Sequence, residues 1–409
     1  MELMKGYKQT EVGVVPMDWD VKNLLDNFTL KARIGWQGLT TEEYLSTGDY
    51  GLVTGTDFRD GYIDWDNCVY VEKIRYVQDK NIQLKVNDVL VTKDGTIGKV
   101  AFVNKLPNPT TLNSGIFVVR PKNPNIDERF FYYILMSSYF DIFLSRITAG
   151  STITHLYQKD FLTFNFILPP RSEQTAIAQA LSDTDIYIKS LQKLIEKKKS
   201  MKQGVMQDLL KPKDGWETKT IKEVATYRRG SFPQPYGLDK WYDDISGSPF
   251  VQVFDVDDNK RLKDETKRYI SKAAQQMSVF VKKGSIILTI QGSIGRIALT
   301  QYDAYVDRTL LIFESFKIPF NSFFFMISIW RIFEIEKELA PGGIIKTITK
   351  EALSSFKISY PKIFEQERIA QILSDIDIEV YALEEKLKKA KSIKDGMMQN
   401  LLTGKIRLI

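Results

Sequence analysis

Acidic side chains gather in two stretches of the sequence, where they could bind a divalent metal. The residues concerned are Asp57, Asp60, Asp64 and Asp66 in the first stretch and Asp255, Asp257 and Asp258 in the second. Carboxylates grouped in this way could hold Mg²⁺ for a nuclease, in which the metal activates water and stabilises developing charge. Acidic loops at a protein surface are far more common. We therefore expect surface loops here and keep a stand-alone Mg-dependent nuclease as an alternative.

The chain has a single cysteine, Cys68, and a single histidine, His155. This excludes a disulfide framework, which needs cysteine pairs, and a structural zinc site, which needs four Cys or His ligands. A Ser–His or Cys–His nucleophile would have to use His155. We expect His155 in a loop or the core, and Cys68 as a small buried hydrophobic residue. The sequence therefore predicts no catalytic residue and no metal site.

Two glycine-containing segments are similar to each other, Gly-Thr-Ile-Gly-Lys at residues 95–99 and Gly-Ser-Ile-Gly-Arg at residues 292–296. A phosphate-binding GxxxxGK[ST] loop needs two more residues between its glycines, so neither segment is a nucleotide site. The glycines favour a tight turn after a strand. Each turn ends in a cation, Lys99 or Arg296, which suits contact with a phosphate. A structural turn with a solvated cation is the alternative interpretation.

These segments belong to an internal repeat with a period of 192 residues. From residue 173 to residue 213, 21 of the 41 positions are identical to the stretch 365–405 without a gap. Both copies begin Glu-Gln and continue to Leu-Ser-Asp-x-Asp-Ile. Weaker similarity relates the globular parts that precede them. The chain is therefore two copies of one plan, with boundaries at 1–172, 173–213, 214–364 and 365–409.

The repeated segments are predicted to be long helices, because their apolar residues recur with the 4-3 spacing of a coiled coil. The predicted seam consists of Ile177, Leu181, Ile188, Leu191, Ile195, Val205 and Leu209 in the first copy and Ile369, Leu373, Ile376, Val380, Leu383, Leu387, Met397 and Leu401 in the second. The seam is interrupted by Thr184, Lys198, Lys202 and Lys394. At 1.5 Å per residue, helices of about 38 residues would be about 57 Å long. We predict mutual antiparallel pairing; two ordinary amphipathic helices are the alternative.

The two globular parts are predicted to be mixed α and β. Short apolar or β-branched stretches indicate strands at 88–91, 116–119, 250–254 and 286–290. Aromatic stretches at 129–135 and 323–327 are interpreted as buried helices, with a platform for stacking bases as the alternative. The fold class is thus α+β, with two repeat-related domains separated by two long antiparallel coiled-coil helices.

Net charge is +6, and it is unevenly distributed. Residues 1–172 carry 19 basic and 20 acidic side chains, whereas residues 214–364 carry 22 and 18. Nucleic-acid binding would therefore need a local patch. The start of the sequence lacks the apolar core of a signal peptide, and the longest apolar runs are shorter than the roughly 20 residues of a membrane span. We expect a cytoplasmic protein with no membrane partner.

This arrangement resembles the specificity subunit of type I restriction-modification systems. The resemblance covers essentially the whole chain. It is carried by the paired helix starts at 173–186 and 365–378, by residues 88–98, and by the segments that end at Trp19 and Trp216. It implies that each variable unit is a target recognition domain reading one half of an asymmetric bipartite site in double-stranded DNA. It also implies that the paired helices act as a ruler and dock two modification subunits.

The resemblance further implies which cofactors the partners bring. The modification subunits use S-adenosylmethionine to methylate adenine, and restriction subunits that use ATP and magnesium can join them. The specificity subunit itself is not catalytic and needs no cofactor, in agreement with the missing motifs. A coiled-coil scaffold that binds protein or RNA remains an alternative to DNA recognition.

Polar and basic side chains beside the predicted strands and turns are the candidates for DNA contact. Arginine, glutamine and asparagine can bond two atoms of one base, whereas lysine mostly meets phosphate. The candidates are Lys31, Arg33, Thr54, Thr56, Arg59, Lys93, Lys99 and Asn113 in the first domain and Arg228, Arg229, Gln252, Arg261, Lys263, Gln291, Arg296 and Arg308 in the second.

Overall fold

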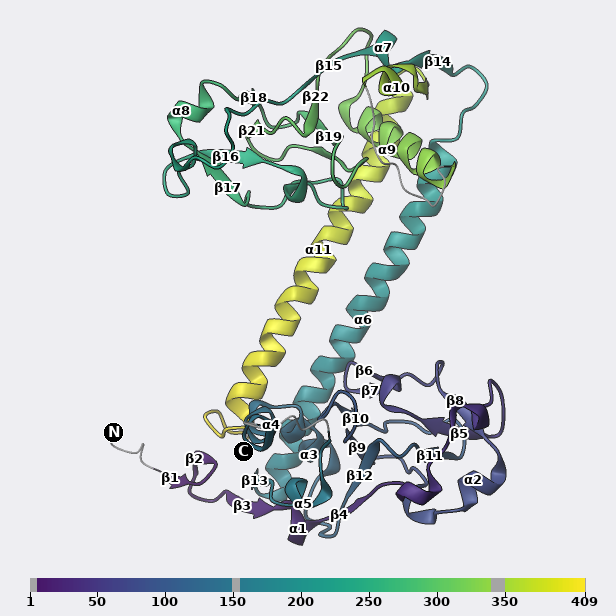
Figure 1. The fold of residues 1–409 in the computed structure, drawn as a ribbon, viewed down its shortest axis with the longest axis vertical. Coiled ribbons are helices and arrows are strands. Elements are labelled where there is room, and N and C mark those ends of the chain that lie inside the picture. The colour runs from purple at the N-terminus through teal and green to yellow at the C-terminus, as the bar shows by residue number, and fades with distance from the viewer. Residues whose placement is uncertain (1–5, 149–154, 340–349, 409) are drawn as a thin grey trace. The chain divides into compact units, whose positions relative to one another are not determined.

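The computed structural model describes residues 6–148, 155–339 and 350–408. The chain forms two compact units, Met1–Lys193 with Glu384–Ile409 (unit 1) and Leu194–Leu383 (unit 2). Each unit contains one globular domain and half of each long helix (Figure 1). In the described parts of the chain, none of the helices combines the length and apolar character that crossing a lipid bilayer requires.

Unit 1 contains a six-stranded sheet, a three-stranded sheet and two small strand pairs. The large sheet has the order β4 (Phe28–Lys31), β12 (Ile116–Pro121), β9 (Val89–Thr92), β10 (Val100–Phe102), β7 (Tyr62–Ile63), β6 (Phe58–Arg59). The three-stranded sheet has the order β11 (Thr110–Leu112), β5 (Tyr50–Val53), β8 (Val69–Val71). The pairs are β1 (Tyr7–Thr10) with β2 (Gly13–Pro16), and β13 (Asn165–Leu168) with β3 (Asp20–Asn23).

Unit 1 also contains short helices. They are α1 (Leu24–Asn27), α2 (Lys73–Val77), α3 (Glu128–Leu135), α4 (Ser138–Thr148) and α5 (Gln158–Phe161), with single 3-10 turns at Gly35–Gln37, Thr41–Glu43, Gly55–Asp57 and Lys80–Ile82. Helix α3 contacts β9 and β10, and all its residues from Phe130 to Leu135 are buried. This confirms the buried-helix interpretation of the first aromatic stretch.

Unit 2 contains two four-stranded sheets and one strand pair. The first sheet has the order β15 (Ala225–Arg229), β22 (Leu310–Phe316), β19 (Ile286–Thr289), β20 (Ile297–Leu299). The second has the order β17 (Arg268–Ile270), β16 (Ser248–Val251), β21 (Ala304–Val306), β18 (Val279–Val281). The pair is β14 (Glu217–Thr220) with β23 (Lys357–Tyr360). The helices are α7 (Ile221–Val224), α8 (Lys272–Gln275), α9 (Ser322–Leu339) and α10 (Lys350–Ser355), with 3-10 turns at Asp239–Trp241 and Val253–Asp255.

The two domains share one topology, as the repeat predicts. The order β4-β12-β9-β10 of unit 1 corresponds to β15-β22-β19-β20 of unit 2. Each also has a parallel strand pair, β5 with β11 and β16 with β21. Helix α9 carries the second aromatic stretch, and its residues 324–327 are buried. The predicted strand at 250–254 is partly wrong: β16 ends at Val251, and the chain turns at Val253–Asp255 because buried Asp255 caps that turn.

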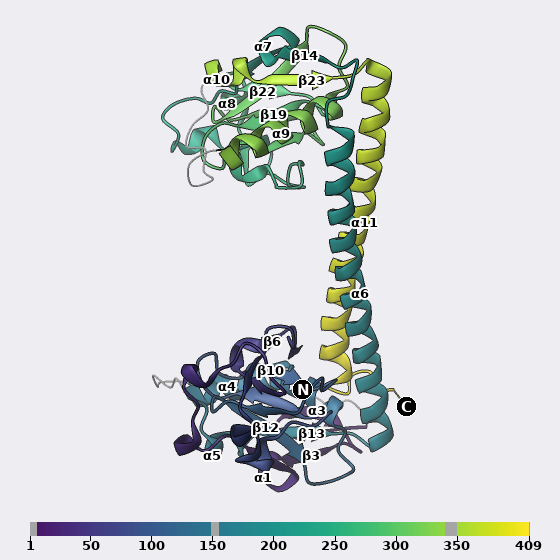
Figure 2. The same cartoon turned by 90° about the vertical axis from the view of Figure 1, so that its right-hand side faces the viewer.

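The long helices are α6 (Arg171–Leu209) and α11 (Ile363–Leu401). In each unit their halves lie side by side in both views (Figures 1 and 2). The first half of α6 pairs with the second half of α11 in unit 1, and the second half of α6 pairs with the first half of α11 in unit 2. The pairing is therefore antiparallel, as predicted. No residue of the predicted seam is exposed.

The Glu-Gln pair at the start of each repeat has a structural role. The Gln174 side chain accepts a hydrogen bond from the Asp127 backbone N–H (2.9 Å) and donates to the Pro169 carbonyl (2.8 Å). Gln366 makes the same bonds to Asn321 (3.0 Å) and to the carbonyl before its own helix (2.9 Å). Both glutamines are 1% exposed. Each therefore fastens a long helix to the start of the aromatic helix of its domain.

Candidate DNA interface

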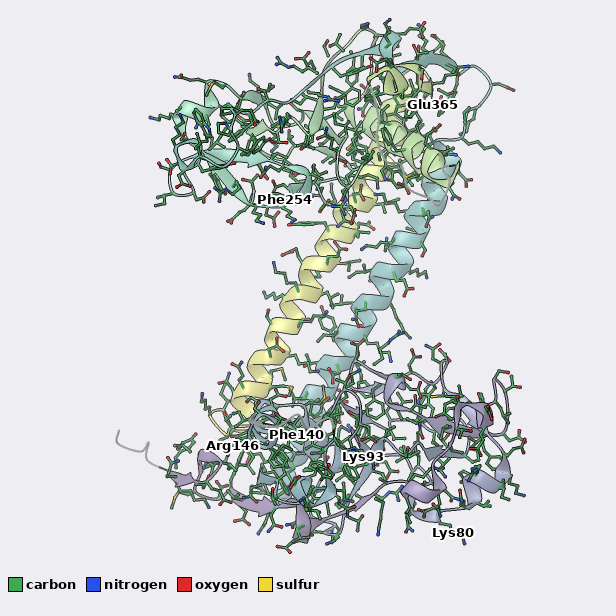
Figure 3. All side chains as sticks on the ribbon, viewed as in Figure 1. Lys80, Lys93, Phe140, Arg146, Phe254 and Glu365 are labelled. Carbon is green, nitrogen blue, oxygen red and sulfur yellow. The ribbon has the colours of Figure 1, made fainter. Side chains whose placement is uncertain are left out.

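The ends of three strands meet in unit 1. The backbone N–H of Asn113, after β11, bonds the carbonyl of Val53 at the end of β5 (2.9 Å). A Cβ atom on Gly55, two residues after β5, would lie 3.2 Å from Thr92 at the end of β9. Lys93 follows directly and is labelled in Figure 3. We call the residues brought together here, in both units, the strand-end surface; in unit 1 they are Thr54, Thr56, Lys93 and Asn113.

A buried carboxylate fixes the backbone at this surface. Asp57 is 6% exposed and accepts a hydrogen bond from the Thr54 backbone N–H (2.7 Å). Burial raises the pKa of Asp57, because desolvation disfavours its charged form. The Thr54 hydroxyl also bonds Asp57 (3.0 Å) and exposed Thr56 (2.7 Å). The carboxylate thus holds the turn after β5 in one conformation.

Unit 2 builds the same surface with different side chains. Asp255, fully buried, accepts from the Gln252 backbone N–H (2.8 Å) as Asp57 does from Thr54. The Asp307 N–H bonds the carbonyl of Val251 (3.0 Å), which brings the end of β21 beside β16. Gly292 lies against Val253, and residues 230–231 bond residues 306 and 310. The strand-end surface of unit 2 therefore consists of Gln252, Gln291, Arg308 and Arg229.

The repeated glycine segments are tight turns in both units. Gly95, Gly98, Gly292 and Gly295 all have positive φ, a conformation that favours glycine. The threonine that ends each preceding strand closes the turn, because its hydroxyl accepts a hydrogen bond from the backbone N–H of Lys99 or Arg296 (both 2.9 Å). A Cβ on Gly98 would lie 2.2 Å from Leu144 of α4. A Cβ on Gly295 would likewise lie 2.8 Å from Phe333 of α9, so Gly98 and Gly295 have a packing role.

Arg33 is a correction to the predicted DNA contacts. Its side chain is buried, with 2% of the residue exposed. The guanidinium donates to the Leu112 carbonyl (2.8 Å) and to the Thr111 hydroxyl (3.1 Å). Burial lowers its pKa, because the charged form loses hydration. Arg33 joins the ends of β4 and β11 inside the domain and does not reach the surface.

Three further candidates have acidic neighbours. Arg59 forms an ion pair with Asp64 (2.9 Å), and Arg296 forms one with Asp258 (2.8 Å). Arg228 lies 3.9 Å from Glu314. Because a carboxylate already faces each guanidinium, contact with a phosphate would first have to break these pairs.

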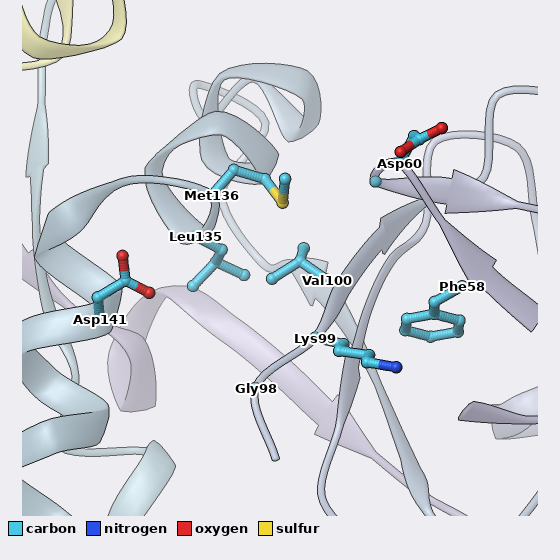
Figure 4. Close-up of a pocket in the computed structure, with 9 residues that line it drawn as sticks. Phe58, Asp60, Gly98, Lys99, Val100, Leu135, Met136 and Asp141 are labelled. Carbon is cyan, nitrogen blue, oxygen red and sulfur yellow. The ribbon is translucent and has the colours of Figure 1, made fainter. Parts of the chain in front are cut away.

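Four candidates remain outside the set of residues that defines the strand-end surface. Lys31, Lys99 and Lys263 are exposed, and the guanidinium of Arg261 packs over the ring of Tyr381 on α11 (4.6 Å). Lys99 borders a cavity of about 330 Å³ between the glycine turn, β6–β7 and the α3–α4 connection (Figure 4). That cavity also has two carboxylates, Asp60 and Asp141, and an apolar wall. Its mixed charge does not favour a phosphate.

The sequence did not identify two features of these surfaces. The His155 imidazole lies against the Asp94 carboxylate, and the neighbouring Leu156 N–H bonds the Lys93 carbonyl (2.7 Å). The only histidine therefore lies at the strand-end surface of unit 1. In unit 2, Arg308 lies over the ring of Tyr236 (5.0 Å). The aromatic residues at 232–242 were a sequence signal that could have indicated this aromatic ring beside Arg308.

The acidic stretches do not form a metal centre in the described residues. Within residues 6–148, 155–339 and 350–408, no three His, Cys, Asp or Glu side chains gather closely enough to hold an ion. Asp57 and Asp255 cap turns instead. Burial raises the pKa of the Cys68 thiol to about 12, which makes it unreactive at neutral pH. The geometry gives the nuclease hypothesis no support.

Comparison with known proteins agrees with this architecture. The model of the type I restriction modification DNA specificity domain matches residues 16–198 and again residues 213–391. The putative type I restriction enzyme MjaX specificity subunit of Methanocaldococcus jannaschii is 27% identical, over 99% of this chain and 97% of its own. The MjaVIII specificity subunit of the same organism is 28% identical, over 99% and 96%.

Solved structures share the fold. The S subunit of a type I restriction-modification system from M. genitalium superimposes with a TM-score of 0.64 at 16% identity, covering 98% of both chains. A chain from a study of complex assembly and conformational transition of the type I R-M system gives 0.54 at 16% identity, covering 96% of this chain and 99% of that one. Two repeat-related recognition domains joined to a pair of antiparallel helices define a DNA specificity protein. The chain belongs to the type I restriction-modification specificity subunit family.

Proposed function

We propose that each recognition domain reads one half of an asymmetric, bipartite target in double-stranded DNA through its strand-end surface. The observation that carries this proposal is that one scaffold presents different side chains in the two units. The capped position after the first parallel strand is Thr54 in unit 1 and Gln252 in unit 2. A fixed backbone with a variable side chain suits direct reading of bases in the major groove.

The chemistry of the two surfaces favours different half-sites. Unit 2 offers Gln252, Gln291 and Arg308, whose side chains can bond two atoms of an adenine or a guanine. Unit 1 offers threonines, Asn113 and Lys93, and residues 1–172 carry one net negative charge. We therefore expect unit 2 to supply more of the salt-dependent affinity. The paired helices would set the spacer between the half-sites.

The partners would be two modification subunits, which carry S-adenosylmethionine and methylate adenine, with restriction subunits using ATP and magnesium as a further addition. Exposed apolar side chains on the long helices support a docking role. Ile186 and Ile378 occupy equivalent positions of the repeat and are 63% and 61% exposed. Tyr187, Leu194 and Met201 follow one another at heptad spacing on α6 and are also exposed. This chain itself would catalyse nothing and would work in the cytoplasm.

The test is a genome-wide map of methylated adenines in cells that carry this chain with its modification partner. The control is the same cells without this chain. A split, asymmetric motif is expected only when the chain is present. Exchange of residues 214–364 for the corresponding segment of a related specificity subunit should then change one half of the motif alone. Identical maps from cells with and without soluble, partner-bound chain would contradict the proposal.

A further inference from the structure

Asp185 of α6 lies where both long helices meet the recognition domain of unit 1. Its carboxylate forms an ion pair with Lys394 of α11 (2.6 Å). It also accepts hydrogen bonds from the hydroxyls of Tyr133 on α3 (2.7 Å) and Tyr62 on β7 (3.4 Å). The side chains of Asp185 and Lys394 are 13% and 20% exposed. One carboxylate thus joins α6, α11 and two elements of the domain.

The repeat places the same pair in unit 2. Asp377 and Lys202 are the equivalents of Asp185 and Lys394, and they also form an ion pair between the two helices. Lys202 is 14% exposed. The domain contributes Lys260 here, whose ammonium lies 3.8 Å from the centre of the Trp330 ring on α9. The lysines of these ion pairs, Lys202 and Lys394, are two of the residues that interrupt the apolar seam.

Ion pairs at such positions need an explanation other than stability. Replacing a buried ion pair with apolar residues is often neutral or stabilising, because desolvation offsets the attraction. Polar residues in a helix seam are known instead to select one register among several. The repeat keeps the pair in both units. In unit 1 two hydroxyls of the recognition domain bond the carboxylate, and in unit 2 the charge of Lys260 in the recognition domain interacts with the charges of Lys202 and Asp377.

We propose that Asp185 and Asp377 are positioning residues, which fix the orientation of each recognition domain on its part of the helix pair and so restrict the spacer length that the protein accepts. This inference rests on the proposed reading of a bipartite target. Neither residue would touch DNA. Their effect would be to exclude targets whose half-sites are one base pair too close or too far apart.

The experiment measures methylation of duplexes by the full chain assembled with its modification subunits. The duplexes carry both half-sites with the native spacer or with a spacer one base pair shorter or longer. Asp185→Asn and Asp377→Asn are compared with Asp183→Asn and Asp375→Asn. The two control carboxylates are exposed, and each accepts a bond from a glutamine one turn away on its own helix (2.7 Å each).

We expect the preference for the native spacer to fall at least fivefold in the Asp185 and Asp377 variants and to stay unchanged in the controls. Loss of folding alone would lower all rates together and leave this ratio unchanged. For a variant that does not fold, Lys202→Leu/Asp377→Leu extends the apolar seam, keeps the helices paired, and should still lose the preference. Retained preference in folded variants would overturn the inference. Wild-type complex without any bipartite specificity would instead overturn the proposed function.

Discussion

The two units share a scaffold, but different contacts stabilise the start of the long helix in each unit. In unit 1, Glu173 accepts hydrogen bonds from the Trp19 indole (3.0 Å) and from Arg407 (2.7 Å), which also pairs with Asp18 (2.8 Å). In unit 2 the residue equivalent to Arg407 is Gly215, and Trp216 instead contacts the ring of Phe324. The repeat therefore preserves the helix start while the two units stabilise it by different means.

This difference has a topological cause. Gly404 packs against Pro16 and its carbonyl accepts a bond from the Tyr7 hydroxyl (2.8 Å), so the segment after α11 is held against β1 and β2. In unit 2 the corresponding segment is a continuous peptide between α6 and β14. A covalent connection needs no ion-pair cluster to hold its two ends together. Side-chain contacts replace that connection in unit 1.

Arg407→Ala should give the largest effect on stability and should affect unit 1 alone. The substitution leaves the Glu173 side chain, which is 4% exposed, without its cationic partner. Breaking a buried ion pair typically costs 3–5 kcal/mol, and the partial exposure of Arg407 reduces this to about 3 kcal/mol. Hydrogen exchange should become faster in strands β3 and β13 and should be unchanged in β14 and β23. Lys405→Ala, an exposed neighbour, is the control; equal loss of protection in both units would contradict the comparison.

Gln252→Ala should relax only the half-site read by unit 2. A side chain that bonds two atoms of one base contributes about 1–3 kcal/mol of discrimination, so roughly tenfold selectivity at one base pair should be lost. Methylation of duplexes with single substitutions in each half-site measures this. Exposed Gln276 in the same unit provides the control substitution Gln276→Ala. A change at the other half-site would show that Gln252 acts through the scaffold rather than on a base.

The comparison of the units also explains what the sequence predicted well. The repeat, the 4-3 spacing and the glycine turns are local or periodic signals, and the structure has the helices and the strand–turn unit at these places. The strand at 250–254 was predicted too long, because the side chain that ends it, Asp255, also bonds the distant Lys267 N–H (3.0 Å). A bond to a residue that is distant in the sequence cannot be recognised from residues 250–254 alone.

The candidate contacts were less predictable for the same reason. A sequence shows that Arg33 is basic and near a strand, but not that it is buried against Leu112, 79 residues later. The lysines that interrupt the helix seam were likewise identified only as flaws. Their carboxylate partners lie on the other helix, 175 or more residues away. Composition identifies charges, whereas pairing depends on the fold.

Lys260→Met tests whether the stability of the two units depends differently on pH. Burial lowers the pKa of Lys260 to about 8, with the charge of Lys202 acting in the same direction and those of Asp377, Glu334 and Asp257 opposing it. The folded chain therefore binds fewer protons than the unfolded chain between pH 8 and about 10.5, and wild-type stability rises over this range. Methionine removes the cost of burying the charge, so unit 2 should gain about 1–2 kcal/mol at pH 7.

That gain should disappear above about pH 10.5, where the wild-type lysine is neutral in both states. Thermal denaturation followed by circular dichroism at a series of pH values measures it, with exposed Lys263→Met as the matched control. A gain that is the same at all pH values would show that methionine acts through packing. In unit 1 the group beside the ion pair is the Tyr62 hydroxyl, whose pKa burial raises to about 12. Its contribution has the opposite sign, because the folded chain keeps this proton longer than the unfolded chain, and stability should fall above about pH 10.

Tyr133→Phe changes a single hydroxyl and tests the unit 1 junction directly. It removes the hydroxyl that donates to Asp185 (2.7 Å) while leaving the buried ring in place. The carboxylate keeps its ion pair with Lys394, so the expected cost is that of one hydrogen bond to a charged group, about 1.5 kcal/mol. Denaturant unfolding measures this cost, and the double variant with Asp185→Asn should cost less than the sum of the two single changes. Additive costs would mean that Tyr133 stabilises unit 1 independently of the carboxylate, and the hydroxyl of Tyr133 would then not hold the recognition domain on Asp185.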